Sequence, residues 1–389
     1  MLLVQFFPSS EWMPMVMMLT AMIVVVVSLA LSLKVGTDYF GLLDHPGAHK
    51  THVTPTPLIG GIAVILTLLL CTLPVWAWHL SGAGEVLLLP PGVLSALLLL
   101  LVVGAVDDAR PVSVRLRLVA QILAVGMMAW SGVLILDIGL FALNDVFGVW
   151  GWAVAALVTL FAVVGCINAF NMIDGMDGLA AGLGVVSLAG LAAVLFMADL
   201  GAQGMLLLIL LGALAGFLLL NMRLGRPRGL VFLGDAGSTT LGFLMAYWVI
   251  VMSQSTDALI PATAALWFLG LPVIDTLRVM LKRMAAGVSP FQPGHDHLHH
   301  LLQARGLGVN QTLAVMLGVQ AVMVGTGIWQ ALFATSALVM TLLWVALIAA
   351  LTVTAEWLRV GRPAIPSAAA DSVRTRQVVD LSIENVKRR

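Results

Sequence analysis

Long, uninterrupted runs of apolar residues recur along this chain and limit its fold more than any other feature. A helix needs about 20 apolar residues to cross the hydrocarbon core of a bilayer. Eleven runs of about that length lie near 13–35, 58–80, 87–106, 117–136, 150–167, 178–198, 204–221, 237–253, 258–281, 312–330 and 333–355. Only 10% of the residues are charged, whereas soluble domains carry about 25%. The sequence therefore predicts an all-α fold, a polytopic membrane helical bundle of about eleven transmembrane helices.

The connections between these runs are too short to hold a separate soluble domain. We therefore expect residues 1–358 to form a single transmembrane domain. The basic segment 359–389 is expected to be a flexible tail. The first apolar run has no basic leader and follows Glu11, which favours an uncleaved helix over a secretory signal.

Basic residues predict the orientation of the bundle, because they stay preferentially on the cytoplasmic side of a membrane. With the N-terminus in the periplasm and the C-terminus in the cytoplasm, all 19 Lys and Arg residues fall on the cytoplasmic side. The charged residues of the opposite loops are then all acidic: Glu11, Glu85, Asp137, Asp145, Asp199 and Asp257. A missed helix would scatter basic residues over both faces, so the charge pattern supports the helix count.

Five polar islands interrupt the apolar runs, at 44–61, 107–121, 168–178, 232–238 and 295–300. The predicted topology places all five on the cytoplasmic side. Ionisable groups at or near membrane depth are costly, and they are usually kept there by function. The islands therefore indicate one composite polar active site.

The first carboxylate pair of interest is Asp107 and Asp108, which end an apolar run and precede Arg115 and Arg117. Adjacent carboxylates disfavour each other's ionised form unless a cation lies between them. Such a pair suits a divalent metal that also binds phosphate oxygens. A solvated helix end neutralised by the arginines is the competing interpretation.

The third island combines amides and carboxylates. Asp174 and Asp177 are three residues apart, which places them on one face of a helix. Asn168 and Asn171 add amides that can bind a phosphate or the edge of a heterocycle. An ordinary Asn-, Asp- and Gly-rich turn is the alternative.

The remaining islands offer phosphate ligands. Asp235 lies in a glycine-rich segment directly before a helix. The first N–H groups of that helix can bind phosphate, and the Asp235 carboxylate would act on phosphate through a metal. A helix cap is the alternative for Asp235.

The histidine-rich segment 295–300 can bind zinc, bind a diphosphate or exchange protons, and a solvated tract is the alternative. Lys50 can pair with a phosphate oxygen or snorkel to the membrane surface. Asp275 and Arg278 are interpreted as a structural ion pair.

Together these motifs resemble the polyprenyl-phosphate N-acetylhexosamine-1-phosphate transferases, of the glycosyltransferase 4 type. The matching segments are Leu42–Pro46 with Lys50 and His52, Val106–Asp108, Asn168–Leu179, Phe232–Ser238 and His297–His300, in the family's order. The His-x-His-His pattern is similar to the branch that uses UDP-N-acetylglucosamine for O-antigen and related glycans. The peptidoglycan branch carries three consecutive histidines instead.

The resemblance implies a reaction in which undecaprenyl phosphate attacks the sugar-bearing phosphorus of a UDP-N-acetylhexosamine and releases UMP. N-acetylglucosamine is the leading sugar, while N-acetylfucosamine, N-acetylquinovosamine and N-acetylgalactosamine stay open. Mg²⁺ is the implied cofactor, with Mn²⁺ as an alternative. The implied location is the bacterial inner membrane, with the active site facing the cytoplasm. Membrane lipids are expected partners and nucleic acid is not, and a homodimer stays open.

The resemblance also implies roles for individual residues. Asp107, Asp108 and Asp235 would be catalytic and hold the metal, with Asp235 as the first ligand and Asp107 orienting or deprotonating the lipid phosphate. The residues expected to bind substrate are Lys50, Asn168, Asn171, Asp174, Asp177, Asn221, Phe232, His297, His299, His300, Arg115 and Arg117. Pro111 stands where the family's third Asp of an Asp-Asp-x-x-Asp motif would be.

Two other classes of protein share some of these features. An aromatic prenyltransferase also uses magnesium and prenyl diphosphates, but it needs a second Asp-rich motif that this sequence lacks. A metal transporter would explain the histidines, but it predicts ionisable residues near helix centres along a conduction path. The clustering of the polar islands on one side favours the transferase over both.

Overall fold

A computed structural model describes residues 13–35, 42–44, 55–80, 88–200, 204–254, 258–289 and 294–359, and they are almost entirely helical. The long helices are α1 (Met13–Val35), α2 (Gly60–Leu80), α3 (Pro91–Ala109), α4 (Val114–Trp130), α6 (Gly151–Ile173), α7 (Leu179–Met197), α8 (Met205–Asn221), α9 (Gly234–Gln254), α10 (Ala262–Ala285), α12 (Val309–Phe333) and α13 (Ala337–Arg359). The short elements are α5 (Leu143–Phe147), a 3-10 turn (Gly148–Trp150), α11 (Leu298–Ala304), and the antiparallel strands β1 (Leu43–Asp44) and β2 (Thr56–Pro57).

Each of the eleven apolar runs coincides with one of the long helices, which confirms the all-α membrane bundle. Within the described residues, eight helical segments are long and apolar enough to cross a bilayer. Two more apolar stretches, Met15–Leu31 and Met205–Asn221, are shorter. Helix α4 also has only 17 residues and begins with Arg115 and Arg117 close to its start. The short helices α5 and α11 were not expected from the sequence.

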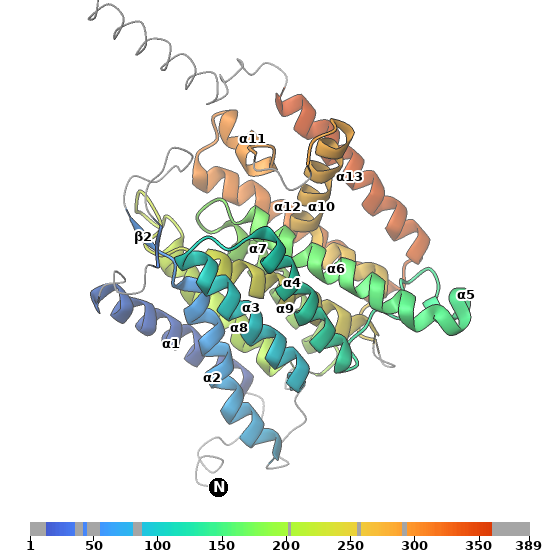
Figure 1. The fold of residues 1–389 in the computed structure, drawn as a ribbon, viewed down its shortest axis with the longest axis horizontal. Coiled ribbons are helices and arrows are strands. Elements are labelled where there is room, and N and C mark those ends of the chain that lie inside the picture. Colours follow the sequence, from blue (N-terminus) through green and yellow to red (C-terminus); the bar gives the residue numbers. More distant parts are fainter. Residues whose placement is uncertain are drawn as a thin grey trace, which may run out of the picture.

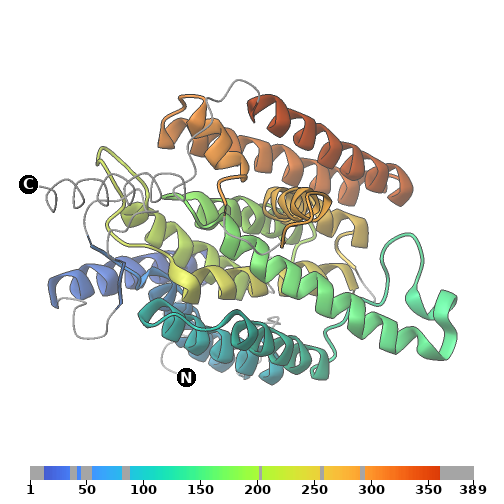
Figure 2. The same cartoon turned by 45° about the horizontal axis from the view of Figure 1, so that its top comes forward.

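Helix α9 is the centre of the bundle. Of its spanning segment, 89% is buried, compared with 11% for α13 at the periphery. Helices α2, α3, α6, α7 and α10 all contact α9, and Figures 1 and 2 show α1 and α2 on one side of the bundle and α13 on the other. Large apolar side chains on the outer helices are exposed, among them Phe161 and Val353. Such side chains are more stable in contact with lipid hydrocarbon than with water, so these faces suit a bilayer.

The first turn of α9 is packed directly against α2 and α3. A Cβ atom added to Gly61 would lie 2.1 Å from the Cα of Gly237, and one added to Gly104 would lie 2.5 Å from the Cα of Ala236. Small residues let helix backbones approach this closely in membrane proteins. The close packing brings the start of α2 and the end of α3 beside Asp235.

Helix α10 is broken near its middle, where Gly270 has φ 24° and Pro272 follows. Pro272 has no N–H, so the Phe268 carbonyl has no helical donor. The amide of Gln320, on α12, donates to the Phe268 carbonyl (3.0 Å) and accepts from the Leu271 N–H (2.8 Å). An unsatisfied backbone group costs several kcal/mol inside a membrane, so Gln320 stabilises the bend that directs the second half of α10.

Candidate active site

The polar islands that the structure describes meet at one end of the bundle. The Phe232 N–H donates to the Pro57 carbonyl (2.8 Å), and the Gly60 N–H donates to the Phe232 carbonyl (3.0 Å). These bonds connect the islands 44–61 and 232–238. Hydrogen bonds from the N–H groups of Asp235 and Ala236 to Asp108 connect the islands 232–238 and 107–121. The side chain of Phe232 is half-buried. Lys50 lies outside the described residues.

Asp108 contacts the start of α9. Its carboxylate accepts hydrogen bonds from the N–H groups of Asp235 (2.7 Å) and Ala236 (3.0 Å). Gly234 makes this approach possible, because it has φ +74° and a Cβ there would lie 2.6 Å from Asp108 Oδ2. Asp108, and not Asp235, therefore caps α9. Two of the N–H groups that the sequence suggested for phosphate are used by this carboxylate.

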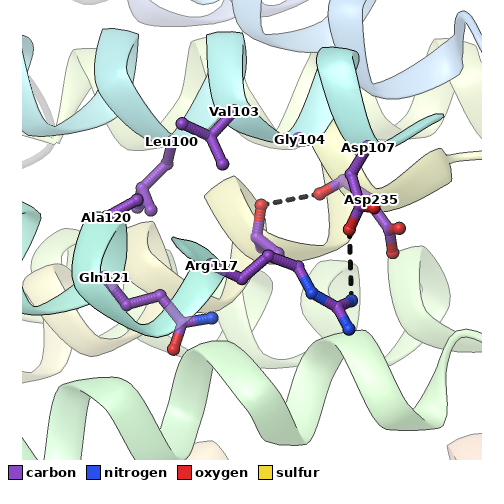
Figure 3. A pocket seen from close by; sticks show the side chains of 9 residues that line it. Leu100, Val103, Gly104, Asp107, Arg117, Ala120, Gln121 and Asp235 are labelled. Atoms are coloured by element: carbon purple, nitrogen blue, oxygen red, sulfur yellow. Dashed lines mark hydrogen bonds and ion pairs between the residues drawn. The ribbon is translucent and has the colours of Figure 1, made fainter. Parts of the chain in front are cut away.

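Asp107 and Asp235 lie side by side at a small cavity between α3, α4 and α9 (Figure 3). Arg117 Nη1 forms an ion pair with Asp107 Oδ2 at 3.1 Å. Asn171, from α6, donates to Asp235 Oδ1 (2.6 Å) and to Ser238 Oγ (3.0 Å). Four helices thus converge on two adjacent carboxylates. Arg115, by contrast, is exposed on α4 and does not line this cavity.

These two carboxylates fit a magnesium ion by their chemistry. Asp107 Oδ2 is buried and, apart from its ion pair with Arg117, has no hydrogen-bond partner among the described residues. Within the same part of the chain, no three His, Cys, Asp or Glu side chains form a complete metal cage. Magnesium in phosphate-transfer sites is usually held by one or two carboxylates, with substrate phosphates and waters completing its shell. Asp107 and Asp235 supply that number, whereas both oxygens of Asp108 already accept hydrogen bonds.

Asn168 lies one turn before Asn171 but has a different environment. Its Nδ2 donates to the Val164 carbonyl (2.8 Å) and to Gln121 Oε1 (2.8 Å). The structure therefore separates the two amides: Asn171 contacts the carboxylate centre, and Asn168 contacts a glutamine of α4. Gln121 itself was the last residue of the second polar island but was not expected to bind anything.

Asp177 and Asn221 hold the loops around the centre. Asp177 Oδ2 accepts from Arg223 Nε (2.7 Å) and from the Gly229 N–H (3.1 Å). Asn221 accepts from the Gly178 N–H (2.6 Å) and donates to the Val231 carbonyl (2.8 Å). The two side chains thereby fasten the loop after α6 to the loop after α8. Their observed contacts are structural, and a direct role in binding substrate stays a prediction.

Asp174, in the same loop, is half-buried and close enough to the other acids for their charge to act on it. Desolvation by burial, followed by the nearby carboxylates of Asp235, Asp108 and Asp177, raises the pKa of Asp174. A raised pKa in a cluster of acids marks a position where a cation would be favourable. Asp174 therefore belongs to the same electrostatic centre as Asp235.

The histidine segment is anchored by Asp275, which is fully buried on α10. Its carboxylate contacts His297 Nδ1 (2.8 Å) and accepts from Arg278 Nη2 (2.7 Å) and from the Leu298 N–H (3.1 Å). Arg278 also donates to the Asp296 carbonyl (2.6 Å). The expected pairing of Asp275 with Arg278 is confirmed, but the bond to His297 was missed. An acidic residue inside an apolar run was the available signal, and its histidine partner lies 22 residues away.

His299 is buried and uncharged. Only 1% of its surface is exposed, and neither ring nitrogen has a hydrogen-bond partner among the described residues. Burial, and then the neighbouring His300, lower the pKa of His299 to about 3. A Cβ on Gly175 would lie 2.9 Å from His299 Nε2, so the ring lies against the loop after α6. The ring of His300 packs against that of His295, with centroids 4.7 Å apart.

Comparison with known proteins agrees with this architecture. Residues 90–253 match the family described as glycosyl transferase family 4. An undecaprenyl-phosphate alpha-N-acetylglucosaminyl 1-phosphate transferase of Yersinia pestis is 33% identical over 300 residues, covering 74% of this chain and 76% of the relative. Proteins of the same name from Escherichia coli K12 (32% over 291 residues; 74% and 76%) and Haemophilus influenzae (29% over 301 residues; 75% and 80%) are also similar. This multi-pass membrane protein belongs to glycosyl transferase family 4.

Proposed function

We propose that this protein transfers N-acetylglucosamine-1-phosphate from UDP-N-acetylglucosamine to undecaprenyl phosphate and releases UMP. The proposal draws on the relatives called undecaprenyl-phosphate alpha-N-acetylglucosaminyl 1-phosphate transferases, whose matches cover about three quarters of the chain. The observation that carries it is the pair of adjacent carboxylates, Asp107 and Asp235, with Arg117 and Asn171 bound to them. This is an arrangement of charges suited to bringing phosphate groups together.

In the reaction, an oxygen of the lipid phosphate forms a bond to the sugar-bearing phosphorus of the donor. The bond from that phosphorus to the oxygen of UMP breaks, and UMP leaves with the electron pair. An acceptor phosphate is largely ionised near neutral pH, so a protein base is not required. The main task of the protein is to position the two phosphates and to offset their charge.

A magnesium ion, with manganese as an alternative, would be held by Asp235 and Asp107 and would neutralise charge on the phosphates. Asp108 supports these ligands by fixing the start of α9 on which Asp235 lies. Arg117 contributes a positive charge beside Asp107, and the exposed Arg115 lies two residues earlier on α4, where it can attract an anionic lipid headgroup.

The donor is assigned to residues of α6, the loops around the centre and the histidine segment. The residues that we assign to the nucleotide sugar are Asn168, Asn171, Asp174, Asp177, Asn221 and Phe232, with Phe232 stacking on the uracil. Those that we assign to the diphosphate and the sugar are Lys50, His297, His299 and His300. His297 is suited to this task because Asp275 accepts from its Nδ1–H, which leaves Nε2 for a ligand.

We assign all eleven long helices as membrane crossings, with the N-terminus in the periplasm and the active site on the cytoplasmic side of the inner membrane. Residues 1–358 then form one catalytic domain, followed by a basic tail. The product would start a lipid-linked O-antigen or a related surface polysaccharide. Assembly as a homodimer stays a prediction.

The test is UMP release by the purified protein in detergent, with undecaprenyl phosphate, magnesium and a panel of UDP-N-acetylhexosamines. We expect release that requires lipid and metal and is fastest with UDP-N-acetylglucosamine. Faster release with another N-acetylhexosamine would correct the sugar. No release from folded protein with any donor would contradict the proposal, and metal uptake by vesicles would then test the transporter alternative.

A further inference from the structure

We infer that Gln121 is an additional substrate-binding residue, whose side-chain amide donates a hydrogen bond to an oxygen of the acceptor phosphate. The inference rests on the proposed function and deepens it, because it assigns one wall of the carboxylate centre to the lipid substrate. It starts from the cavity of Figure 3 and from one chain of hydrogen bonds.

Gln121 lies four residues after Arg117 on α4, so both side chains are on one face of the helix. Only 5% of Gln121 is exposed. Both residues line a cavity of about 20 Å³, together with Asp107 and Asp235. A cavity needs about 10–15 Å³ to hold one water molecule. The space therefore takes one oxygen-sized group between the α4 side chains and the carboxylates.

The hydrogen bonds of Asn168 determine which end of the Gln121 amide faces the cavity. The backbone carbonyl of Val164 can only accept, so the Asn168 atom that contacts it must be the Nδ2 donor. The same Nδ2 contacts the Gln121 amide at 2.8 Å, so the atom facing it must be the Oε1 acceptor. The Gln121 Nε2 is thereby left to point away from Asn168. In Figure 3 it points towards the guanidinium of Arg117.

Two donors, Gln121 Nε2 and the guanidinium of Arg117, thus line one cavity with two carboxylates, and the guanidinium is also paired with Asp107 at 3.1 Å. Neighbouring donors favour an anionic oxygen, as in other oxyanion sites, and the metal ion proposed for Asp107 and Asp235 would offset the two carboxylates. A neutral water would satisfy the same donors without gaining from the positive charge. The ligand chemistry that fits is therefore a phosphoryl oxygen.

The apolar wall of the cavity identifies which phosphate this is. Leu100 and Val103 of α3 and Ala120 of α4 supply its apolar side chains, and Gly104 and Thr239 complete the lining. The adjacent surface of both helices carries exposed apolar side chains, among them Val102, Leu118 and Ile122, which suit hydrocarbon. A phosphate on a prenyl chain can reach this wall with its chain in the membrane. The water-soluble donor is assigned to Asn171 and the histidine segment instead.

The test compares Gln121→Met and Gln121→Glu with the wild-type protein. Methionine keeps the volume but removes the donor together with the acceptor of the Asn168 bond, whereas glutamate keeps that acceptor and replaces the donor with a negative charge that faces the phosphate. We expect the KM for undecaprenyl phosphate to rise roughly 10- to 100-fold in Gln121→Met, as for loss of a hydrogen bond to a charged group. Glutamate should raise this KM further, while the KM for the UDP-sugar stays within about twofold in Gln121→Glu, which retains the Asn168 contact.

Gln330→Met is the matched control. Gln330 is also a fully buried glutamine in a membrane helix, and it donates to Thr263 near the first residues of α10, away from the carboxylate centre. A general cost of losing a buried amide would affect this variant equally. We expect it to keep both KM values of the wild type.

A binding measurement distinguishes recognition of the phosphate from recognition of the prenyl chain, and it does not need turnover. Farnesyl phosphate and farnesol are compared as ligands of the wild type and Gln121→Met. The variant should lose affinity for farnesyl phosphate alone. Equal losses for both ligands, or a raised KM for the UDP-sugar only, would overturn the inference. Absence of UMP release by the wild type would instead contradict the proposed function, while the binding comparison would still test Gln121.

Discussion

The carboxylate of Asp108, at the end of α3, accepts hydrogen bonds from the N–H groups of Asp235 and Ala236 at the start of α9. Asp107, its neighbour in sequence, has a different partner and forms an ion pair with Arg117. Two adjacent carboxylates therefore have different contacts: one positions the helix that carries Asp235, and the other lines the cavity beside Asp235.

This division predicts that Asp107→Asn and Asp108→Asn lose activity for different reasons. Both should reduce UMP release at least about 100-fold, by analogy with the loss of one charge-stabilising group at an active site. Only Asp108→Asn should also lower the thermal unfolding temperature, because the amide keeps one acceptor oxygen and leaves the second backbone N–H unpaired, which costs about 1 kcal/mol. Thermal unfolding in detergent checks this difference. Equal unfolding temperatures for the two variants would contradict the capping role.

Asp235→Asn should abolish transfer while the protein stays folded. The amide keeps the shape of the side chain but removes the charge that a magnesium ion requires. Manganese binding followed by electron paramagnetic resonance should weaken in Asp235→Asn and in Asp107→Asn. Glu356→Gln, an exposed carboxylate on α13 that pairs with Lys282, is the control and should bind manganese as the wild type does. Wild-type turnover in Asp235→Asn would contradict the assignment of the metal site.

Phe232→Ala should weaken binding of the UDP-sugar more than binding of undecaprenyl phosphate. Stacking of a base on an aromatic ring is worth about 1–3 kcal/mol, so we expect the KM for the UDP-sugar to rise roughly 5- to 150-fold. The KM for undecaprenyl phosphate should stay within about twofold. Steady-state kinetics with each substrate varied in turn measure both values. The opposite pattern in Phe232→Ala would place the ring on the lipid side.

Removing the anchor of the histidine segment should destabilise the protein. Asp275→Leu leaves Arg278 as an uncompensated buried charge, which costs about 3–5 kcal/mol, and it also removes the acceptor of the His297 Nδ1–H. The double variant Asp275→Leu with Arg278→Met should regain thermal stability, since neither charge of the buried pair is left. It should not regain activity, because His297 is no longer held. Recovery of both would show that Asp275 serves stability alone.

The buried His299 predicts a loss of stability in acid. Its pKa is about 3 in the folded protein, compared with about 6.5 for an unfolded histidine. Below about pH 6.5 the unfolded chain binds a proton that the folded chain does not, so the free energy of unfolding decreases by up to about 1.4 kcal/mol per pH unit. His299→Phe should reduce this dependence between pH 6.5 and 5, as measured by thermal unfolding in a pH series. An unchanged slope would contradict the buried, neutral state.

The helices could be predicted from sequence because a bilayer requires each spanning helix to have about 20 consecutive apolar residues. Each run coincides with a long helix, from α1 to α13. The residue types at the site were also found, since charged groups are conspicuous among apolar ones. Asp107, Asp235 and Asn171 lie together as the motifs indicated.

The partners of individual side chains could not be predicted, because they depend on contacts between distant segments. Gln320 binds the break in α10 across 49 residues of sequence, and Asp177 binds Arg223 across 46. In the sequence, Gln121 is only the last polar residue of an island. The hydrogen bond from Asn168 determines the orientation of its amide. No local pattern encodes these pairs, since they follow from how α4, α6, α10 and α12 pack.

The contact between Gly61 and Gly237 affects how sequences of related proteins should be interpreted. Each glycine occupies space that a methyl group on the other would need, so neither can mutate without a shift of α2 against α9. Selection should keep both for steric reasons, even in a descendant that has lost its substrates. An invariant glycine beside Asp235 is therefore no measure of retained chemistry. The polar neighbours Asn171 and Asp107 are the positions whose loss in a descendant would reveal a change of activity.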